Sequence, residues 1–156
     1  MLRRSTLLVL LGLMWAGSAL SGAEPLQEIH FTSTLEGSQQ PALFWAPESA
    51  RTEATPLLVL LHTWSGNYRQ DNRVWHEPAQ SRGWIYLQPD FRGRNDSPEA
   101  CGSALARQDI LDAMAFVEEN YRVDHDRIYL AGTSGGGHMA MRMAVYPRAR
   151  MSAVSP

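Results

Sequence analysis

The chain has 156 residues, of which 44% are hydrophobic and 19% charged, and its formal net charge at pH 7 is −2. This length suits one domain, and the composition indicates a globular protein with a buried core. All 14 basic residues are arginine, which excludes a P-loop lysine, a Schiff-base lysine and the base of Ser–Lys hydrolases. No basic patch stands out, so we expect no nucleic-acid partner.

The first 23 residues predict a secretory signal peptide. Arg3 and Arg4 form a basic start, an apolar run covers 7–15, and the small residues 21–23 give a cleavage site. The apolar run is shorter than the roughly 20 residues of a membrane span. We therefore expect a secreted or periplasmic protein without a stable membrane anchor; an uncleaved N-terminal anchor is the alternative. The single cysteine, Cys101, has no internal disulfide partner.

After this segment the sequence predicts strands that alternate with helices. Residues 29–35 and 43–46 indicate an antiparallel hairpin around a turn at 36–38. Continuous apolar runs of strand length are typical of strands that are covered on both faces. There are three such runs, at residues 57–61, 84–87 and 128–131.

Helical patterns separate these strands. Residues 72–82 predict a short helix ended by Gly83, although Pro78 can break or kink it. The helical spacing of four apolar residues predicts a second helix, in which three acidic residues lie outside the apolar stripe. The stripe is Ile110, Met114, Val117 and Tyr121, and the acidic residues are Asp109, Asp112 and Glu119. A third helix covers 138–145, and 151–156 begins a further strand. The alternation predicts an α/β fold, a mostly parallel sheet with flanking helices.

A tight turn between the third buried strand and the third helix carries the motif G-x-S-x-G. In that setting the motif predicts a nucleophile elbow, with Ser134 at its tip. The elbow glycines Gly132 and Gly136 leave room for a strained turn. The Gly135 N–H, near a helix N-terminus, is the first candidate donor to a developing oxyanion.

Two other readings of this turn compete with catalysis. A glycine-rich turn can cradle a nucleotide phosphate, but the sequence has no G-x-G-x-x-G, and the turn follows the third buried strand rather than the first. The other reading is a purely structural turn in which Ser134 is inert.

A second oxyanion donor is expected from the loop after the first buried strand, residues 62–66. The backbone N–H of Trp64, or else that of Thr63, is the candidate. His62 is expected to orient this loop, because the catalytic base of the fold follows the serine in the chain.

The sequence resembles the prolyl-oligopeptidase-type branch of the α/β-hydrolases over residues 57–145. Three stretches carry the resemblance: Asp90-Phe91-Arg92-Gly93, Gln108-Asp109-Ile110, and the run from Asp126 to Gly137. The resemblance implies a serine peptidase or esterase that works through an acyl-serine on a small ester or peptide substrate, with no metal or organic cofactor.

Two departures from that family favour a compact single domain. The stretch between residue 23 and the first buried strand is too short for the β-propeller that gates the oligopeptidases. Some members have an aromatic residue after the serine; Gly135 stands there in this chain and is expected to open the pocket beside the nucleophile.

The catalytic acid and base are not evident in this sequence. After Ser134 it has no Asp or Glu, and its only histidine is His138, within the predicted helix. We therefore expect residues 24–156 to be the N-terminal portion of a C-terminally truncated α/β-hydrolase domain, with little turnover alone. The alternative is a non-catalytic binding or pseudo-enzyme domain. The oligomeric state stays open.

Overall fold

The structure is a computed structural model that describes residues 23–146 and 149–156. Apart from Ala23, the predicted signal peptide lies outside the described residues. The six strands are β1 (Gln27–Thr32), β2 (Gln39–Trp45), β3 (Thr55–Leu61), β4 (Ile85–Pro89), β5 (Val123–Gly132) and β6 (Ala153–Ser155). The helices are α1 (Arg73–Ser81), α2 (Ala104–Asn120) and α3 (Gly135–Ala144), with a 3₁₀ turn, η1 (Glu48–Arg51).

The strands form one mixed sheet in the order β1-β2-β4-β3-β5-β6. β1 and β2 pair antiparallel, as does β2 with β4, whereas β4, β3, β5 and β6 run parallel. The predicted edge hairpin and the mostly parallel sheet are both confirmed, and so is the strand predicted near residue 151. Parallel strands put their carboxyl ends at one edge, where the turns after β3, β4 and β5 meet.

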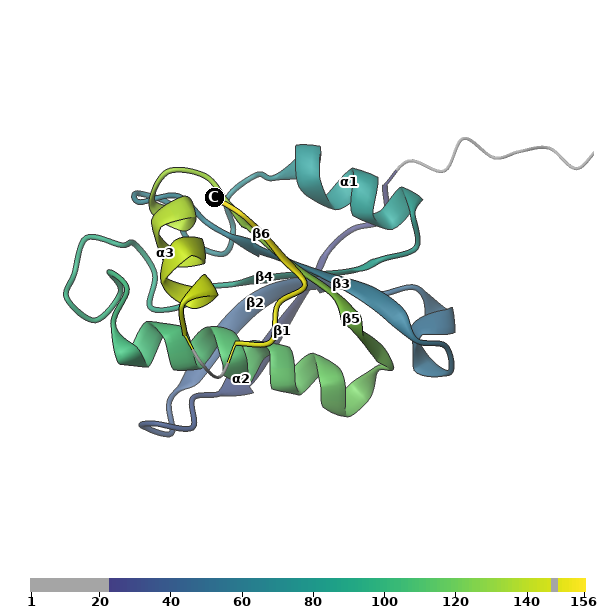
Figure 1. Cartoon of the computed structure of the whole chain (residues 1–156), viewed down its shortest axis with the longest axis horizontal. Helices are drawn as coiled ribbons and strands as arrows, with labels where there is room; N and C mark the ends of the chain where they lie inside the picture. The colour runs from purple at the N-terminus through teal and green to yellow at the C-terminus, as the bar shows by residue number, and fades with distance from the viewer. Residues whose placement is uncertain (1–22, 147–148) are drawn as a thin grey trace, which may run out of the picture.

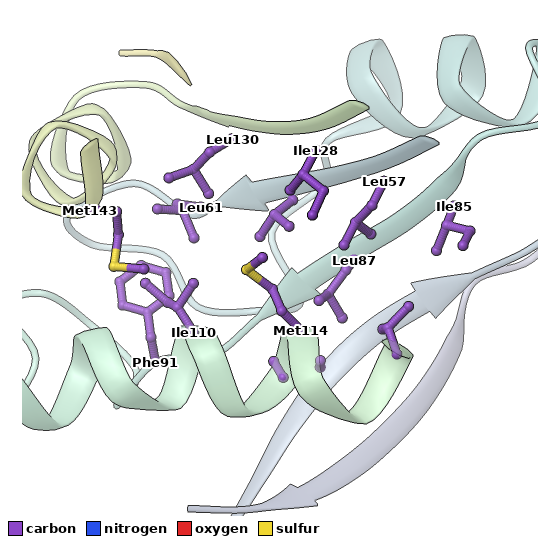
Figure 2. Close-up of a cluster of buried hydrophobic side chains, with 14 of the residues drawn as sticks. Leu57, Leu61, Ile85, Leu87, Phe91, Ile110, Met114, Ile128, Leu130 and Met143 are labelled. Carbon is purple, nitrogen blue, oxygen red and sulfur yellow. The ribbon is translucent and has the colours of Figure 1, made fainter. Parts of the chain in front are cut away.

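Helices cover both faces of the sheet, and Figure 1 shows α1 and α2 on opposite sides. Every residue of β3 is buried, as its continuous apolar run predicts. The larger core cluster joins the sheet to α2 and α3, and Figure 2 shows Ile110 and Met114 of α2 pointing towards Leu57, Leu61 and Leu87. No helix in the described ranges is both long and apolar enough to cross a bilayer.

An apolar groove of about 400 Å³ opens on the α1 side of the sheet. Its walls are mainly large hydrophobic side chains of α1, β3, β5 and the residue that precedes β4. They include Leu58, Val74, Trp75, Trp84 and Tyr129. Val74 is 80% exposed although it is a large apolar residue.

Two charged residues of α2 are buried, which the helical pattern did not predict. Asp109 and Asp112 are 0% and 7% exposed. Asp112 accepts hydrogen bonds from the backbone N–H (2.7 Å) and the hydroxyl (3.0 Å) of Thr34. Asp109 pairs with Arg92. Both carboxylates are buried because partners from distant loops reach them.

Three boundaries differ from those predicted. α1 runs through Pro78 without a break, because one missing N–H is offset by the packing of Trp75 and Ala79 on the sheet. β4 continues to Pro89, which pairs with Ala42 on the neighbouring strand. α3 begins at Gly135, three residues earlier than predicted, because the glycines form its first turn.

Candidate active site

Ser134 lies in strained backbone between β5 and α3. Its φ of 58° and ψ of −117° place a non-glycine residue in a sparsely populated region. The residue is exposed, while Gly135 and Gly136 behind it are buried. The turn therefore presents the hydroxyl to solvent at the carboxyl edge of the sheet, as the motif predicts.

The glycines around Ser134 are required by close backbone contacts. A Cβ at Gly132 would lie 2.4 Å from the carbonyl carbon of Gly136. A Cβ at Gly136 would lie 2.2 Å from the backbone oxygen of Leu61, at the end of β3. The first turn of α3 is thus pressed against both β5 and β3, and the position of Ser134 is set by that packing.

The loop after β3 passes directly over Gly135. A Cβ at Gly135 would lie 2.5 Å from the backbone nitrogen of Trp64 and 3.0 Å from Nδ2 of Asn95. The expected open pocket beside the nucleophile is therefore wrong at this point, because backbone atoms of Trp64 fill the space that a side chain would take. Because Gly135 has no side chain, the loop after β3 can lie directly against the first turn of α3.

Of the two N–H groups proposed from sequence as the second oxyanion donor, only that of Trp64 has no acceptor in the described part of the chain. The N–H of Thr63 donates to Oε1 of Gln70 at 3.0 Å, and the Thr63 hydroxyl donates to the same oxygen at 2.8 Å. This side-chain bond occupies Thr63 and leaves Trp64 beside the elbow.

His62 is fully buried and joins this loop to the one after β4. Its ring nitrogens lie 3.0 Å from the backbone oxygen of Thr63 and 2.6 Å from that of Asp90. The ring stacks on Phe91 with centroids 4.0 Å apart. Both nitrogens lie against backbone oxygens of the two loops, which agrees with a role in orienting the loop.

The loop after β4 is held by a buried ion pair. Phe91, Arg92 and Gly93 all have positive φ, and Arg92 binds Asp109 on α2 and Glu36 of the β1–β2 turn. The hydrogen bonds to Asp109, and then to Glu36, raise the pKa of Arg92 against the opposing effect of burial. The ion pair anchors a strained loop that continues to Asn95.

Asn95 is a residue of the site that sequence reasoning missed. Its backbone N–H donates to the backbone oxygen of Trp64 at 2.8 Å, and its side chain is 1% exposed. The motif Asp90-Phe91-Arg92-Gly93 marks the loop, but nothing in the pattern indicates that a residue two positions further contacts the elbow.

The described residues place no histidine or carboxylate in a hydrogen bond with the Ser134 hydroxyl. The His138 side chain lies against the loop after β4, where a Cβ at Gly102 would come within 3.2 Å of its Cε1. Its backbone N–H donates to the Ser134 oxygen at 2.9 Å, as α3 requires. Within the same residues no group of three or more His, Cys, Asp or Glu side chains could hold a metal ion.

Comparison with known proteins identifies the family. Residues 44–152 match the family described as BD-FAE, which is an α/β-hydrolase family. The chain belongs to the BD-FAE family. No curated protein matches it. The match covers the sheet, the elbow and the loops around it.

Solved structures with the same fold are peptidases and esterases. Acylaminoacyl peptidase from Pyrococcus horikoshii aligns with 22% identity and a TM-score of 0.67 over 83% of this chain. A thermostable esterase aligns with 18% identity and a TM-score of 0.67 over 83% of the chain. Oligopeptidase B from Leishmania major aligns with 15% identity and a TM-score of 0.64 over 84%. The resemblance to prolyl-oligopeptidase-type α/β-hydrolases is confirmed.

This BD-FAE chain spans only part of those proteins. It covers 22% of the Pyrococcus peptidase, 40% of the thermostable esterase and 20% of oligopeptidase B. At these identities the likeness shows the fold, and the chemistry has to be argued from the residues of the site.

Proposed function

We propose that this chain carries the nucleophile and oxyanion hole of an exported serine hydrolase that cleaves ester or peptide bonds through an acyl-serine. The observation that carries the proposal is the backbone of Ser134, a non-glycine residue at φ 58° and ψ −117° on an exposed strand-to-helix turn. Strain of this kind persists only where surrounding structure imposes it, and it clusters at functional sites.

The proposed chemistry divides between the serine and two backbone donors. Ser134 Oγ attacks the substrate carbonyl carbon while a general base takes its proton, and the carbonyl oxygen becomes an oxyanion. The N–H groups of Gly135 and Trp64 are assigned to stabilise that charge, which is supported by the close approach of the Trp64 nitrogen to Gly135. Collapse of the intermediate expels the alcohol or amine and leaves an acyl-serine, which water then hydrolyses.

The general base is assigned to a histidine outside residues 135–156. This stretch contains no Asp or Glu, and its one histidine, His138, lies against the loop at Gly102. Because a serine hydroxyl is a weak nucleophile without a base, the proposed activity requires a histidine and a carboxylate from a further segment or partner. No metal or organic cofactor is part of the proposal.

A fluorophosphonate probe tests the assignment of Ser134. In a form of the protein that includes the histidine and the carboxylate, we expect labelling that Ser134→Ala abolishes. Ser81→Ala should leave it unchanged, since Ser81 lies at the end of α1 and its hydroxyl donates only to the Pro78 oxygen. Labelling that survives Ser134→Ala, or a protein with its acid and histidine supplied that never labels, would contradict the proposal. For export, N-terminal sequencing of the protein from the periplasm or medium should begin at Glu24.

A second candidate is a non-catalytic binding domain that keeps the hydrolase scaffold. Its motivation is that no histidine or carboxylate is hydrogen-bonded to the Ser134 hydroxyl in the described part of the chain. The probe separates the two, because a pseudo-enzyme binds substrate without forming a covalent adduct at Ser134.

A further inference from the structure

The elbow brings a third hydrogen-bond donor to the two backbone N–H groups. The point where Gly135 would carry a Cβ lies 2.5 Å from the Trp64 nitrogen and 3.0 Å from Nδ2 of Asn95. Among the described residues, no hydrogen bond is donated by the N–H of Gly135, by the N–H of Trp64 or by the Asn95 amide nitrogen. The Asn95 amide nitrogen therefore lies next to Gly135 and Trp64, the two residues whose N–H groups are the proposed oxyanion donors.

The burial of Asn95 is costly for the fold. Its side chain is 1% exposed, and its Oδ1 has no hydrogen-bond partner among the residues described. Leaving a buried polar atom unpaired costs about 1–3 kcal/mol, so such a group in a native structure calls for an explanation. Fold stability alone would favour an apolar side chain at this position.

The backbone of Asn95 fixes where its side chain stands. Its N–H donates to the Trp64 oxygen at 2.8 Å, which ties the loop after β4 to the loop after β3. Arg92 anchors the same loop through Asp109 on α2. The carboxamide is thus preorganised, and a donor held in place before reaction needs no reorganisation when charge develops.

The geometry points to Asn95 as a catalytic residue whose side-chain amide supplies a third donor to the oxyanion. This inference rests on the proposed function. It adds a side-chain contact to the backbone N–H groups of Gly135 and Trp64. Because a carboxamide can donate to an anion and a carboxylate cannot, Asn95→Asp removes the donor with almost no change of shape.

A thiol at the elbow tests the inference without the missing base. In the full chain carrying Cys101→Ser and Ser134→Cys, the only thiolate reacts with two reagents. With p-nitrophenyl acetate, sulfur bonds to the acetyl carbon through an oxyanion and p-nitrophenolate leaves. With iodoacetamide, sulfur bonds to the methylene carbon and iodide leaves, with no oxyanion. The ratio of the two rate constants isolates the oxyanion hole from thiol access and thiol pKa.

We expect Asn95→Ala and Asn95→Asp each to lower acetylation by about 10²-fold while alkylation stays unchanged. Asn120→Ala is the matched control, because Asn120 lies at the far end of α2 and binds only the Phe116 oxygen. The inference is overturned if acetylation persists in Asn95→Ala, or if Asn95→Asp restores the rate that Asn95→Ala loses. Equal falls in both reactions would show a role in packing instead and overturn it as well.

The same data distinguish failure of this inference from failure of the proposed function. In the unmodified chain Cys101 is the only thiol, and it gives the reference ratio of acetylation to alkylation. If the elbow thiol shows no higher ratio than Cys101, the oxyanion hole itself is absent. If its ratio is higher but insensitive to Asn95, only the third donor is refuted.

Discussion

Substitution of Gly136 by alanine should displace the elbow from the sheet. A Cβ there would lie 2.2 Å from the Leu61 oxygen and 2.7 Å from the His62 oxygen. Contacts between a carbon and a carbonyl oxygen rarely fall below about 3.3 Å, so the first turn of α3 must move by about 1 Å. Neither oxygen can retreat easily, because both belong to backbone at the end of a buried strand.

The displacement should affect chemistry more than stability. Overpacking costs about 1–3 kcal/mol, and about 1 kcal/mol of helix propensity gained from alanine offsets part of it. A displacement of about 1 Å at the reacting groups costs about 10²-fold in rate. We therefore expect Gly136→Ala to lower acetylation of the elbow thiol, in the Cys101→Ser and Ser134→Cys chain, by about that factor.

Gly83→Ala provides the matched control. Gly83 has a φ of +65° and no atom within 4 Å of the position of a Cβ, so the change adds backbone strain without a clash. It should cost about 1–2 kcal/mol of stability and leave acetylation unchanged. The reasoning is refuted if Gly136→Ala acetylates at the parental rate, or if Gly83→Ala slows the reaction equally.

Three further predictions concern the rest of the fold. Arg92→Ala should lower the free energy of unfolding, measured in urea, by about 3 kcal/mol because it leaves the buried carboxylate of Asp109 unpaired. Arg73→Ala, which breaks an exposed ion pair with Asp71, should hardly change that free energy. Burial lowers the pKa of His76, so the unfolded state binds more protons than the folded state just below pH 6.5. The free energy of unfolding should therefore fall as the pH drops below that value. His76→Phe should make the free energy of unfolding less dependent on pH in this range. Val74→Glu in the apolar groove should reduce self-association in sedimentation and lower the binding of a hydrophobic dye. Val145→Glu, at a similarly exposed position just after α3, should change neither. A chain that stays monomeric and binds no dye would contradict this.

The elements that sequence reasoning predicted share one property, which is that neighbouring residues determine them. A run of five apolar residues is enough to identify β3, because a strand covered on both faces has no polar side. The elbow is predictable for a similar reason: Gly132, Ser134 and Gly136 meet one another within a single turn.

The buried carboxylates of α2 could not be predicted in this way. Hydrophobic periodicity assigns Asp109 and Asp112 to the solvent side, since a charged side chain is buried only where partners satisfy it. Those partners, Arg92 and Thr34, belong to loops that reach α2 only after the sheet has formed. Their presence is a consequence of the fold rather than of the helix.

The choice between Trp64 and Thr63 shows the same limit at the site. Both backbone N–H groups lie in the expected loop, and the sequence favoured Trp64 without excluding Thr63. Gln70, seven residues beyond Thr63, removes one of them by accepting its N–H. Asn95 holds the loop after β3 at Trp64, because its N–H donates to the Trp64 oxygen. Long polar side chains thus decide which donor stays free, and that decision depends on distances that no local pattern encodes.

The strain at Ser134 has a structural origin that links these observations. α3 begins one residue after the serine, and its first turn is wedged between the end of β3 and the end of β5. The chain can enter that helix from β5 only through a residue with positive φ, so relaxing Ser134 would pull Gly135 away from Trp64 and Asn95. Strain in the nucleophile and convergence of the donors are therefore two results of the same close packing. A substitution that moves the first turn of α3, as Gly136→Ala is expected to do, should therefore change both the backbone of Ser134 and the position of Gly135 against Trp64.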